Sequence, residues 1–162
     1  MINPSINLLI AEDNHDDATL FGLALKKAGV SARLQIVSDG EQTIAYLKGE
    51  GKYADRAAHP LPDLLLLDLN MPRQNGFEVL EWIRGDEAFK HLIVHVFSAS
   101  GRGEDVSRVY GFCANSYLVK PSRLSDLVIM IQGLVTYHHF VSLPLLNRAS
   151  SATKPGALKS VS

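Results

Sequence analysis

The stretch LLLLDLNMPRQNG, from Leu64 to Gly76, joins the most apolar run in the first half of the chain to a charged residue. Four leucines lead directly into Asp68. A run that is apolar at every position is typical of a central parallel strand buried on both faces. Burying an uncompensated charge in such a strand would be costly. The stretch therefore predicts a parallel strand that delivers a carboxylate to the surface at its carboxyl end.

Short apolar runs alternate with longer segments of helical period on both sides of this stretch. Such alternation favours an α/β fold, a doubly wound five-stranded parallel sheet with helices on both faces. The second run alternates apolar and polar residues, which is typical of a half-covered edge strand. We expect strands at 7–11, 33–37, 64–67, 93–97 and 116–119, and helices at 16–28, 42–47, 77–84, 105–114 and 122–140, the last capped by Ser122.

The length of 162 residues and the 46% hydrophobic content predict one domain with a substantial core. We assign residues 1–146 to this domain. Residues 48–62 form a long polar loop before the third strand. Residues 147–162 are rich in Ser, Ala, Lys and Gly, and we expect them to be a disordered tail.

Charge and cysteine content restrict the classes of partner and compartment. With 16 basic and 17 acidic residues, the formal net charge is -1, so no bulk attraction to nucleic acid or membrane is expected. The single cysteine, Cys113, excludes an internal disulfide and indicates a reducing, cytoplasmic location; we expect its side chain in the core. We expect no signal peptide, and no apolar run approaches the roughly 20 residues of a membrane span.

Polar residues follow four of the five expected strands, at the edge where ligands bind in doubly wound sheets. Each residue alone is commoner as a helix cap or turn residue, but the combination at successive strand ends favours a shared site. The four strand ends carry Glu12-Asp13, Asp68, Ser98-Ala99 and Lys120-Pro121.

The chemistry of this group points to a phosphoryl site. Three carboxylates would repel one another, and a hard divalent cation with oxygen ligands, Mg²⁺, would resolve the repulsion. Lys120 adds a fixed positive charge. Asp68 would then be the nucleophile and form an acyl phosphate. Asn70 lies where the chain turns over the site, Pro72 fixes the turn, and Gly76 permits an unusual backbone angle.

At these positions the sequence resembles the receiver domain of two-component response regulators. Glu12-Asp13-Asn14, Asp68-Leu69-Asn70-Met71-Pro72 with Gly76, Ser98-Ala99 and Lys120-Pro121 match in order and spacing. The resemblance implies the flavodoxin-like fold with strand order 2-1-3-4-5. It also implies a phosphoacceptor signalling protein rather than an enzyme, with a partner histidine kinase that donates a phosphoryl group to Asp68.

The resemblance also assigns roles to individual residues. Mg²⁺, with Mn²⁺ as a substitute, is held by Asp13, Asp68 and the carbonyl of Asn70, and Glu12 acts through a water. Other positions bind the phosphoryl group or respond to it. These are the switch hydroxyl Ser98, its neighbour Ala99, the phosphoryl-binding Lys120, the switch aromatic Tyr117 and Pro121, which is expected to follow a cis peptide bond.

A narrower resemblance concerns LLLLDLNMPRQNGFEVL, the long loop before it and ANSYLVKPSRLSDL. Together they are similar to the single-domain regulators that partner bacterial phytochromes. The residues after Phe140 are too few for an output domain, and we expect output to pass through protein contacts.

The last helix carries more apolar residues than its inward face needs. We expect a homodimer through this helix and the segment after it. The alternative is that Pro144 and its neighbouring leucines fold back on their own domain. The expected dimer surface comprises Ile129, Met130, Tyr137 and Phe140.

Two other functions compete with the phosphoacceptor. One is a pseudo-receiver, a binding module that never takes a phosphoryl group; the presence of Asp13, Asp68 and Lys120 counts against it. The other is a phosphohydrolase with an aspartyl nucleophile. That chemistry would want an acid/base aspartate just after Asp68, where Asn70 cannot exchange protons.

Overall fold

The computed structural model describes residues 5–144 and residue 146. Its centre is one five-stranded sheet in the order β2-β1-β3-β4-β5, with every neighbouring pair parallel. The predicted fold class and strand order are confirmed, and β2 lies at an edge as its alternating pattern indicates. The strands are β1 (Ile6–Ala11), β2 (Ala32–Val37), β3 (Leu64–Leu67), β4 (Ile93–Ser98) and β5 (Ser116–Val119).

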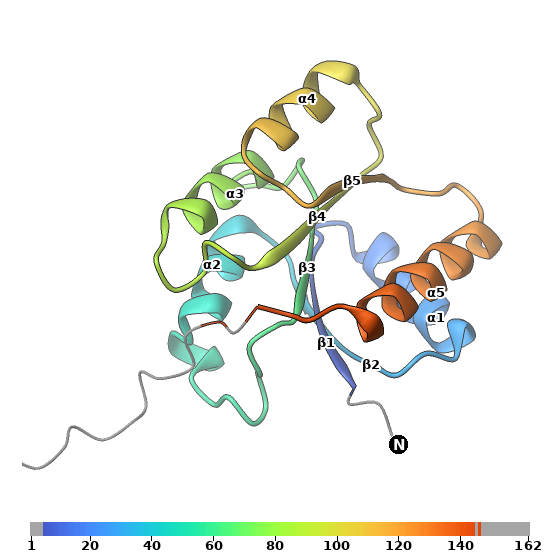
Figure 1. The fold of residues 1–162 in the computed structure, drawn as a ribbon, viewed down its shortest axis with the longest axis horizontal. Helices are drawn as coiled ribbons and strands as arrows, with labels where there is room; N and C mark the ends of the chain where they lie inside the picture. Colours follow the sequence, from blue (N-terminus) through green and yellow to red (C-terminus); the bar gives the residue numbers. More distant parts are fainter. Residues whose placement is uncertain (1–4, 145, 147–162) are drawn as a thin grey trace, which may run out of the picture.

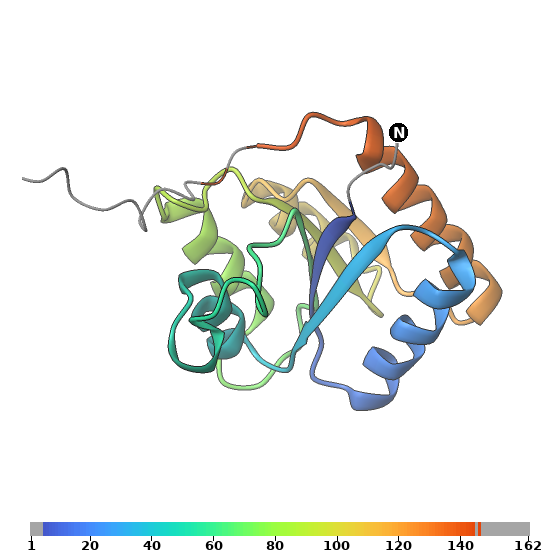
Figure 2. The same cartoon turned by 90° about the horizontal axis from the view of Figure 1, so that it is seen from below.

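Helices cover both faces of this sheet (Figures 1 and 2). One face carries α1 and α5, and the other carries α2, α3 and α4. A short 3₁₀ helix, η1, begins the long loop before β3. The bounds are α1 (His15–Ala28), α2 (Gly40–Lys48), η1 (Gly51–Tyr53), α3 (Gly76–Gly85), α4 (Gly103–Gly111) and α5 (Leu124–Phe140).

The four leucines of β3 are fully buried because they supply both halves of the core. Side chains alternate between the faces of a strand. Leu65 and Leu67 pack with side chains of α2, α3 and α4, whereas Leu64 and Leu66 pack with those of α1 and α5. The central strand is therefore apolar at every position, as the sequence predicts.

Strand register brings the polar strand ends level with one another. Ala11 pairs with Leu67, so Glu12 and Asp68 follow at the same height, and the Asp68 N–H donates to the Ala11 carbonyl at 3.1 Å. At the other side, the Lys120 N–H donates to the Ser98 carbonyl at 2.8 Å. This edge, the lower one in Figure 2, is where the candidate site forms.

Two predictions about helix ends are wrong. Arg123 is the N-cap of α5 and no side chain caps it, so Ser122 does not have the expected role. The fourth helix ends at Gly111 instead of 114, because the turn after it places Cys113 in the left-handed region at φ 60°. Cys113 is consequently exposed, and its expected core position is wrong.

The segment after α5 folds back on its own domain, the alternative considered for Pro144 and its neighbours. It crosses the amino-terminal ends of the strands in Figure 1. Leu143 packs against the core beneath α1 and α5, and Leu146 is buried in the core on the opposite face. The predicted disordered tail, 147–162, lies outside the described residues. Among the helices that the structure describes, none has the length and apolar character needed to cross a membrane.

Candidate functional site

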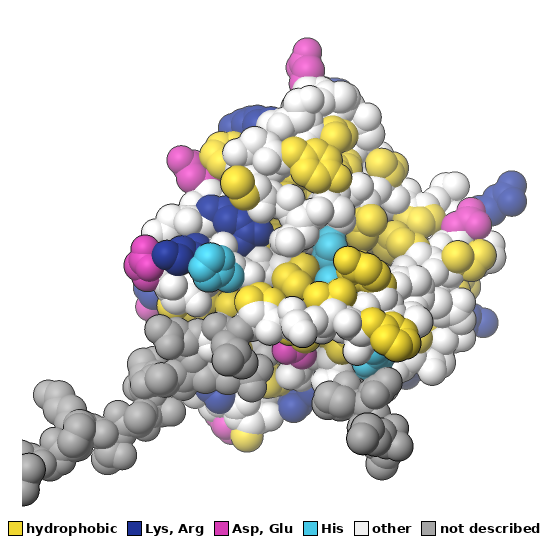
Figure 3. Space-filling view, viewed as in Figure 1, with side chains coloured by type: hydrophobic (Ala, Val, Ile, Leu, Met, Phe, Trp, Pro, Cys, Tyr) yellow, Lys and Arg dark blue, Asp and Glu magenta, His cyan; other side chains and the backbone are white. Residues whose placement is uncertain are grey.

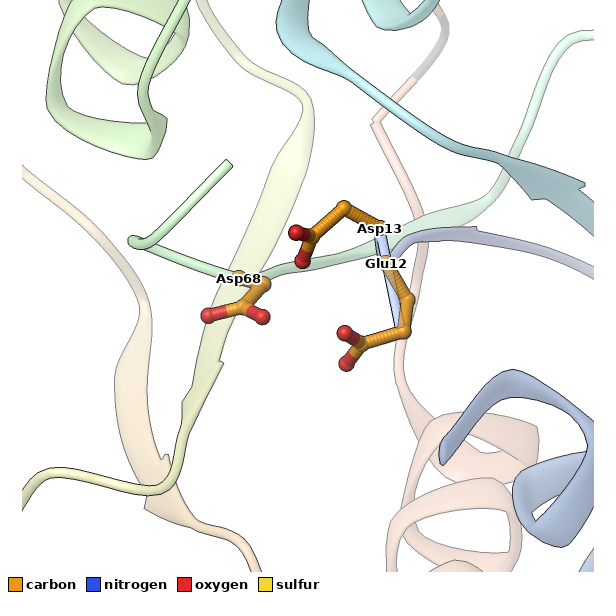
Figure 4. A group of neighbouring side chains, drawn as sticks. All are labelled: Glu12, Asp13 and Asp68. Carbon is orange, nitrogen blue, oxygen red and sulfur yellow. The ribbon is translucent and has the colours of Figure 1, made fainter. Parts of the chain in front are cut away.

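Three carboxylates meet at the carboxyl edge of the sheet. Glu12 and Asp13 follow β1, and Asp68 follows β3. Their oxygen atoms lie within 4.8 Å of one another, and Figure 4 places the three side chains around one space. Glu12 and Asp68 are buried, whereas Asp13 is exposed. The predicted convergence of these residues is confirmed.

Lys120 brings its ammonium group into this cluster from the end of β5. Its Nζ donates to Asp68 Oδ2 at 3.2 Å and to the carboxylate of Glu12. The side chain of Lys120 is only 13% exposed, so these contacts are largely shielded from water. Its Nζ also lies over the ring of Phe97, 5.5 Å from the ring centroid. The predicted lysine and the acceptor carboxylate are therefore in direct contact.

Asp17 also belongs to this cluster, although the sequence did not predict it. Its Oδ2 accepts a hydrogen bond from Lys120 Nζ at 3.2 Å. Asp17 lies in the first turn of α1, where its N–H donates to the N-cap side chain of Asn14 at 3.0 Å. Its position in the sequence could have indicated this role. Asp17 comes about one helical turn after Asp13, on a helix that starts at this edge of the sheet, so it faces the same site.

Burial and charge perturb two groups of the cluster. Burial raises the pKa of Glu12 to about 7; the hydrogen bond from Lys120 opposes this shift, and the charge of Asp68 adds to it. Burial alone would lower the pKa of Lys120. The hydrogen bond to Glu12 and the charges of Asp68 and Glu12 outweigh that effect and raise it. Lys120 therefore stays charged, and its single positive charge does not balance all of the carboxylates around it.

This arrangement fits a magnesium ion. The cluster offers carboxylate oxygens only, which suits a hard cation, and exposed Asp13 leaves a side open to water. Asn70 lies in the adjoining loop, where its N–H donates to Asp68 Oδ1 at 3.2 Å. This bond orients the acceptor carboxylate. The carbonyl of Asn70 remains an expected ligand.

The expected switch residues lie at the end of β4, in the loop after it and on β5. Ser98 is fully buried, and its hydroxyl accepts a hydrogen bond from the Ser100 N–H at 3.3 Å. The Tyr117 hydroxyl donates to the carbonyl of the same Ser100. Ala99 is exposed between them. Ser98 and Tyr117, the two switch candidates, are thus both hydrogen-bonded to Ser100.

Pro121 differs from expectation. The peptide bond between Lys120 and Pro121 is trans, as are the others among the described residues. The trans form is the preferred isomer of most bonds to proline. It still allows Lys120 to reach the acidic cluster.

The expected dimer surface is mostly exposed. Ile129 is 65% exposed, Tyr137 64% and Phe140 88%. Met130 instead packs partly buried against the core beneath α1 and α5. Figure 3 shows hydrophobic side chains gathered over α4 and α5 on this side of the molecule.

Comparisons with known proteins agree with this geometry. A sequence profile of the response regulator receiver domain matches residues 8–132. The chain is 36% identical over 135 residues to Response regulator Rcp1 of Synechocystis sp., covering 83% of this chain and 90% of that protein.

Solved structures give the same result. Response regulator RPA3017, in red light signaling of R. palustris, superposes with a TM-score of 0.80 at 39% identity and covers 86% of this chain and 99% of that one. The phosphorylated cyanobacterial phytochrome response regulator RcpA gives a TM-score of 0.78 at 34% identity, covering 87% of this chain and 99% of that one.

Proposed function

We propose that this chain, which belongs to the response regulator receiver family, accepts a phosphoryl group on Asp68 from a partner histidine kinase. Receiver domains are phosphoacceptor signalling proteins that bind Mg²⁺ at an acidic site. The observation that carries the assignment to Asp68 is its place in the cluster. Its carboxylate is contacted by Lys120 and by the N–H of Asn70, beside the oxygens of Glu12 and Asp13.

The transfer is a displacement at phosphorus. A carboxylate oxygen of Asp68 attacks the phosphorus of the kinase phosphohistidine, and the phosphorus–nitrogen bond breaks. The imidazole leaves neutral because its other nitrogen already carries a proton. Lys120 Nζ, now on Asp68, moves onto an oxygen of the incoming phosphoryl group and balances its charge. Bound magnesium would be held by Asp13 and Asp68 and would offset the repulsion between the carboxylates and the phosphoryl oxygens.

The response to phosphorylation involves Ser98 and Tyr117. A phosphoryl group adds about -1.5 to -2 charges and three strong acceptors beside the buried Ser98 hydroxyl. That hydroxyl turns from Ser100 to the phosphoryl group and draws the loop after β4 with it. Because the Tyr117 hydroxyl is bound to the Ser100 carbonyl, the aromatic ring is released or shifted by the same movement. The altered surface is formed by α4, β5 and α5.

The partners follow from the relatives and from the exposed face of α5. Two similar proteins are described as a phytochrome response regulator and a regulator in red light signaling, and we assign the donor kinase here to the bacterial phytochromes. Ile129, Tyr137 and Phe140 supply an apolar surface for a homodimer. The dimer is tested by sedimentation equilibrium at micromolar concentration. A monomer there would contradict it, and so would a dimer that persists in Ile129→Lys.

The phosphoacceptor assignment is tested with acetyl phosphate, a small donor that bypasses the kinase. Intact mass spectrometry should detect one phosphoryl group on the parent protein in the presence of Mg²⁺, and none on Asp68→Asn. Asp126→Asn, a matched change at an exposed carboxylate on α5, should take up the group normally. Rapid turnover of phosphate esters, or labelling that survives Asp68→Asn, would contradict the assignment.

The kinase assignment needs a separate measurement. Phosphorylated bacterial phytochrome from the same organism should transfer its phosphoryl group faster to this protein than any other histidine kinase of that organism does. A faster transfer from an unrelated kinase would contradict the phytochrome partner while leaving Asp68 as the acceptor.

A further inference from the structure

We infer that the first turn of α2 holds the loop after β3 in the shape needed for metal binding, with Gly40 and Arg73 as positioning residues. The inference rests on the proposed function, because that loop carries Asn70, the expected carbonyl ligand. It concerns two residues that lie outside the acidic cluster itself.

The loop after β3 has a strained turn at its centre. Arg73 has φ 64°, in the left-handed region that residues other than glycine rarely adopt. The Gln74 N–H donates to the Pro72 carbonyl at 2.7 Å, which closes a three-residue turn around Arg73. Turns of this kind are rare and persist only where their surroundings hold them. The loop therefore needs a support outside itself.

The backbone of α2 provides the main support. Gly40, the first residue of α2, is buried against the loop. A Cβ atom at this position would lie 2.1 Å from the carbonyl oxygen of Gln74 and 2.6 Å from its Cβ. Neither neighbour is the free end of a flexible side chain. Only glycine permits the contact, and any larger residue must displace the loop.

Ion pairs attach the same turn to α2 from the solvent side. Arg73 Nη1 lies 3.9 Å from Asp39 Oδ2 and 3.6 Å from Glu41 Oε2. Asp39 is buried and fixed as the N-cap of α2, since its side chain accepts from the Gln42 N–H at 2.7 Å. Arg73 is 64% exposed, so these pairs are weak, and we rank them below the Gly40 contact.

The support acts on the metal site because the site has two halves. Glu12 and Asp13 come from β1, whereas Asp68 and Asn70 come from β3 and its loop. Shifting the turn at Arg73 moves Asn70, three residues earlier, relative to Asp13. The predicted effect of losing the support is a weaker affinity for Mg²⁺, and not a loss of the acceptor residue.

The test is isothermal titration of Mg²⁺ into the parent protein and into Gly40→Ala. We expect at least tenfold weaker binding for the variant. The rate of phosphorylation by acetyl phosphate should fall at low Mg²⁺ and recover at saturating Mg²⁺. Gly133→Ala is the matched control, because a Cβ there meets nothing within 4 Å, and it should bind Mg²⁺ like the parent.

Two variants at the exposed Arg73 keep the test informative if Gly40→Ala does not fold. Arg73→Ala removes the ion pairs but keeps the strain, and should weaken Mg²⁺ binding about threefold. Arg73→Gly removes both and should weaken it less. Unchanged affinity in the folded Gly40→Ala and Arg73→Ala variants would overturn the inference. If the variants lose Mg²⁺ affinity as expected but the parent takes no phosphoryl group, the support stands and the proposed function fails.

Discussion

A buried histidine pair connects β4 to the end of α5 and should make the stability of the fold depend on pH. His95 Nε2 lies 2.9 Å from His138 Nε2, and His95 Nδ1 lies 2.5 Å from Ser116 Oγ. Both rings are buried, and His138 Nδ1 has no partner among the described residues. The proposed phosphoryl transfer uses neither ring, so the pair can be changed without touching the site.

The size of the effect follows from the shift in pKa. Burial, with a smaller contribution from the charge of His138, lowers the pKa of His95 to about 4 from an ordinary value of 6.5. As pH falls below 6.5 the unfolded chain binds a proton before the folded chain does. The contribution of the uncharged His95 ring to the free energy of unfolding is thus fully present above pH 6.5, and it is lost as the pH falls from there to about 4. The loss in free energy of unfolding amounts to about 2 kcal/mol by about pH 5 and about 3 kcal/mol by about pH 4.

Urea unfolding followed by Trp82 fluorescence, at about pH 7.5 and about pH 5, measures this loss. The double variant His95→Phe/His138→Phe replaces both partners by apolar rings and removes the titration. Other groups titrate equally in both proteins. We therefore expect the parent to lose at least about 2 kcal/mol more than the double variant between the two pH values, because burial lowers the pKa of His138 as well.

The control is Ile93→Ala, two residues before His95 on the same face of β4. It should lower stability by about 2–5 kcal/mol at both pH values without changing the difference between them. Equal pH dependence in the parent and the double histidine variant would mean that burial does not disfavour the charged ring, and would contradict this prediction.

Four further predictions concern the site, the core and an open position on α5. Magnesium at about a hundredfold excess over its dissociation constant should raise the free energy of unfolding by about 2.7 kcal/mol, and Asp13→Asn should lose most of this gain; an equal gain in both would contradict the site. Gly76→Ala should cost about 2–3 kcal/mol, because a Cβ there would lie 2.4 Å from the Asp68 carbonyl oxygen. Gly133→Ala, in an open helical position, should add about 0.5–1 kcal/mol in the same urea titration. Leu146→Ala should cost about 2 kcal/mol, and a cost near zero would show that the segment after α5 is not part of the core.

The fold and the acidic cluster were predictable because both depend on repeating patterns. The leucines of β3 could be buried on both faces only in a parallel sheet covered by helices. Parallel strands then bring their carboxyl ends to one edge, which places Glu12, Asp68 and Lys120 together without further information. The hydrophobic pattern and the strand order are therefore enough to predict this part of the structure.

Features set by local backbone geometry or by distant contacts were not predictable in the same way. The end of α4 depends on a left-handed residue at Cys113, a conformation for which cysteine gives no signal. Asp17 looks like an ordinary first-turn acid, and only the approach of Lys120 makes it part of the site. The burial of Leu146 against the far face of the sheet requires the path of the chain after α5, which no periodicity encodes.

Whether Asp68 is the phosphoryl acceptor can be seen in a crystal structure grown with magnesium and beryllofluoride, which mimics an aspartyl phosphate. We expect beryllofluoride attached to a carboxylate oxygen of Asp68, contacted by Lys120 Nζ, with a magnesium ion held by Asp13 and Asp68. A structure in which Asp68 carries nothing while the ions bind elsewhere would contradict it.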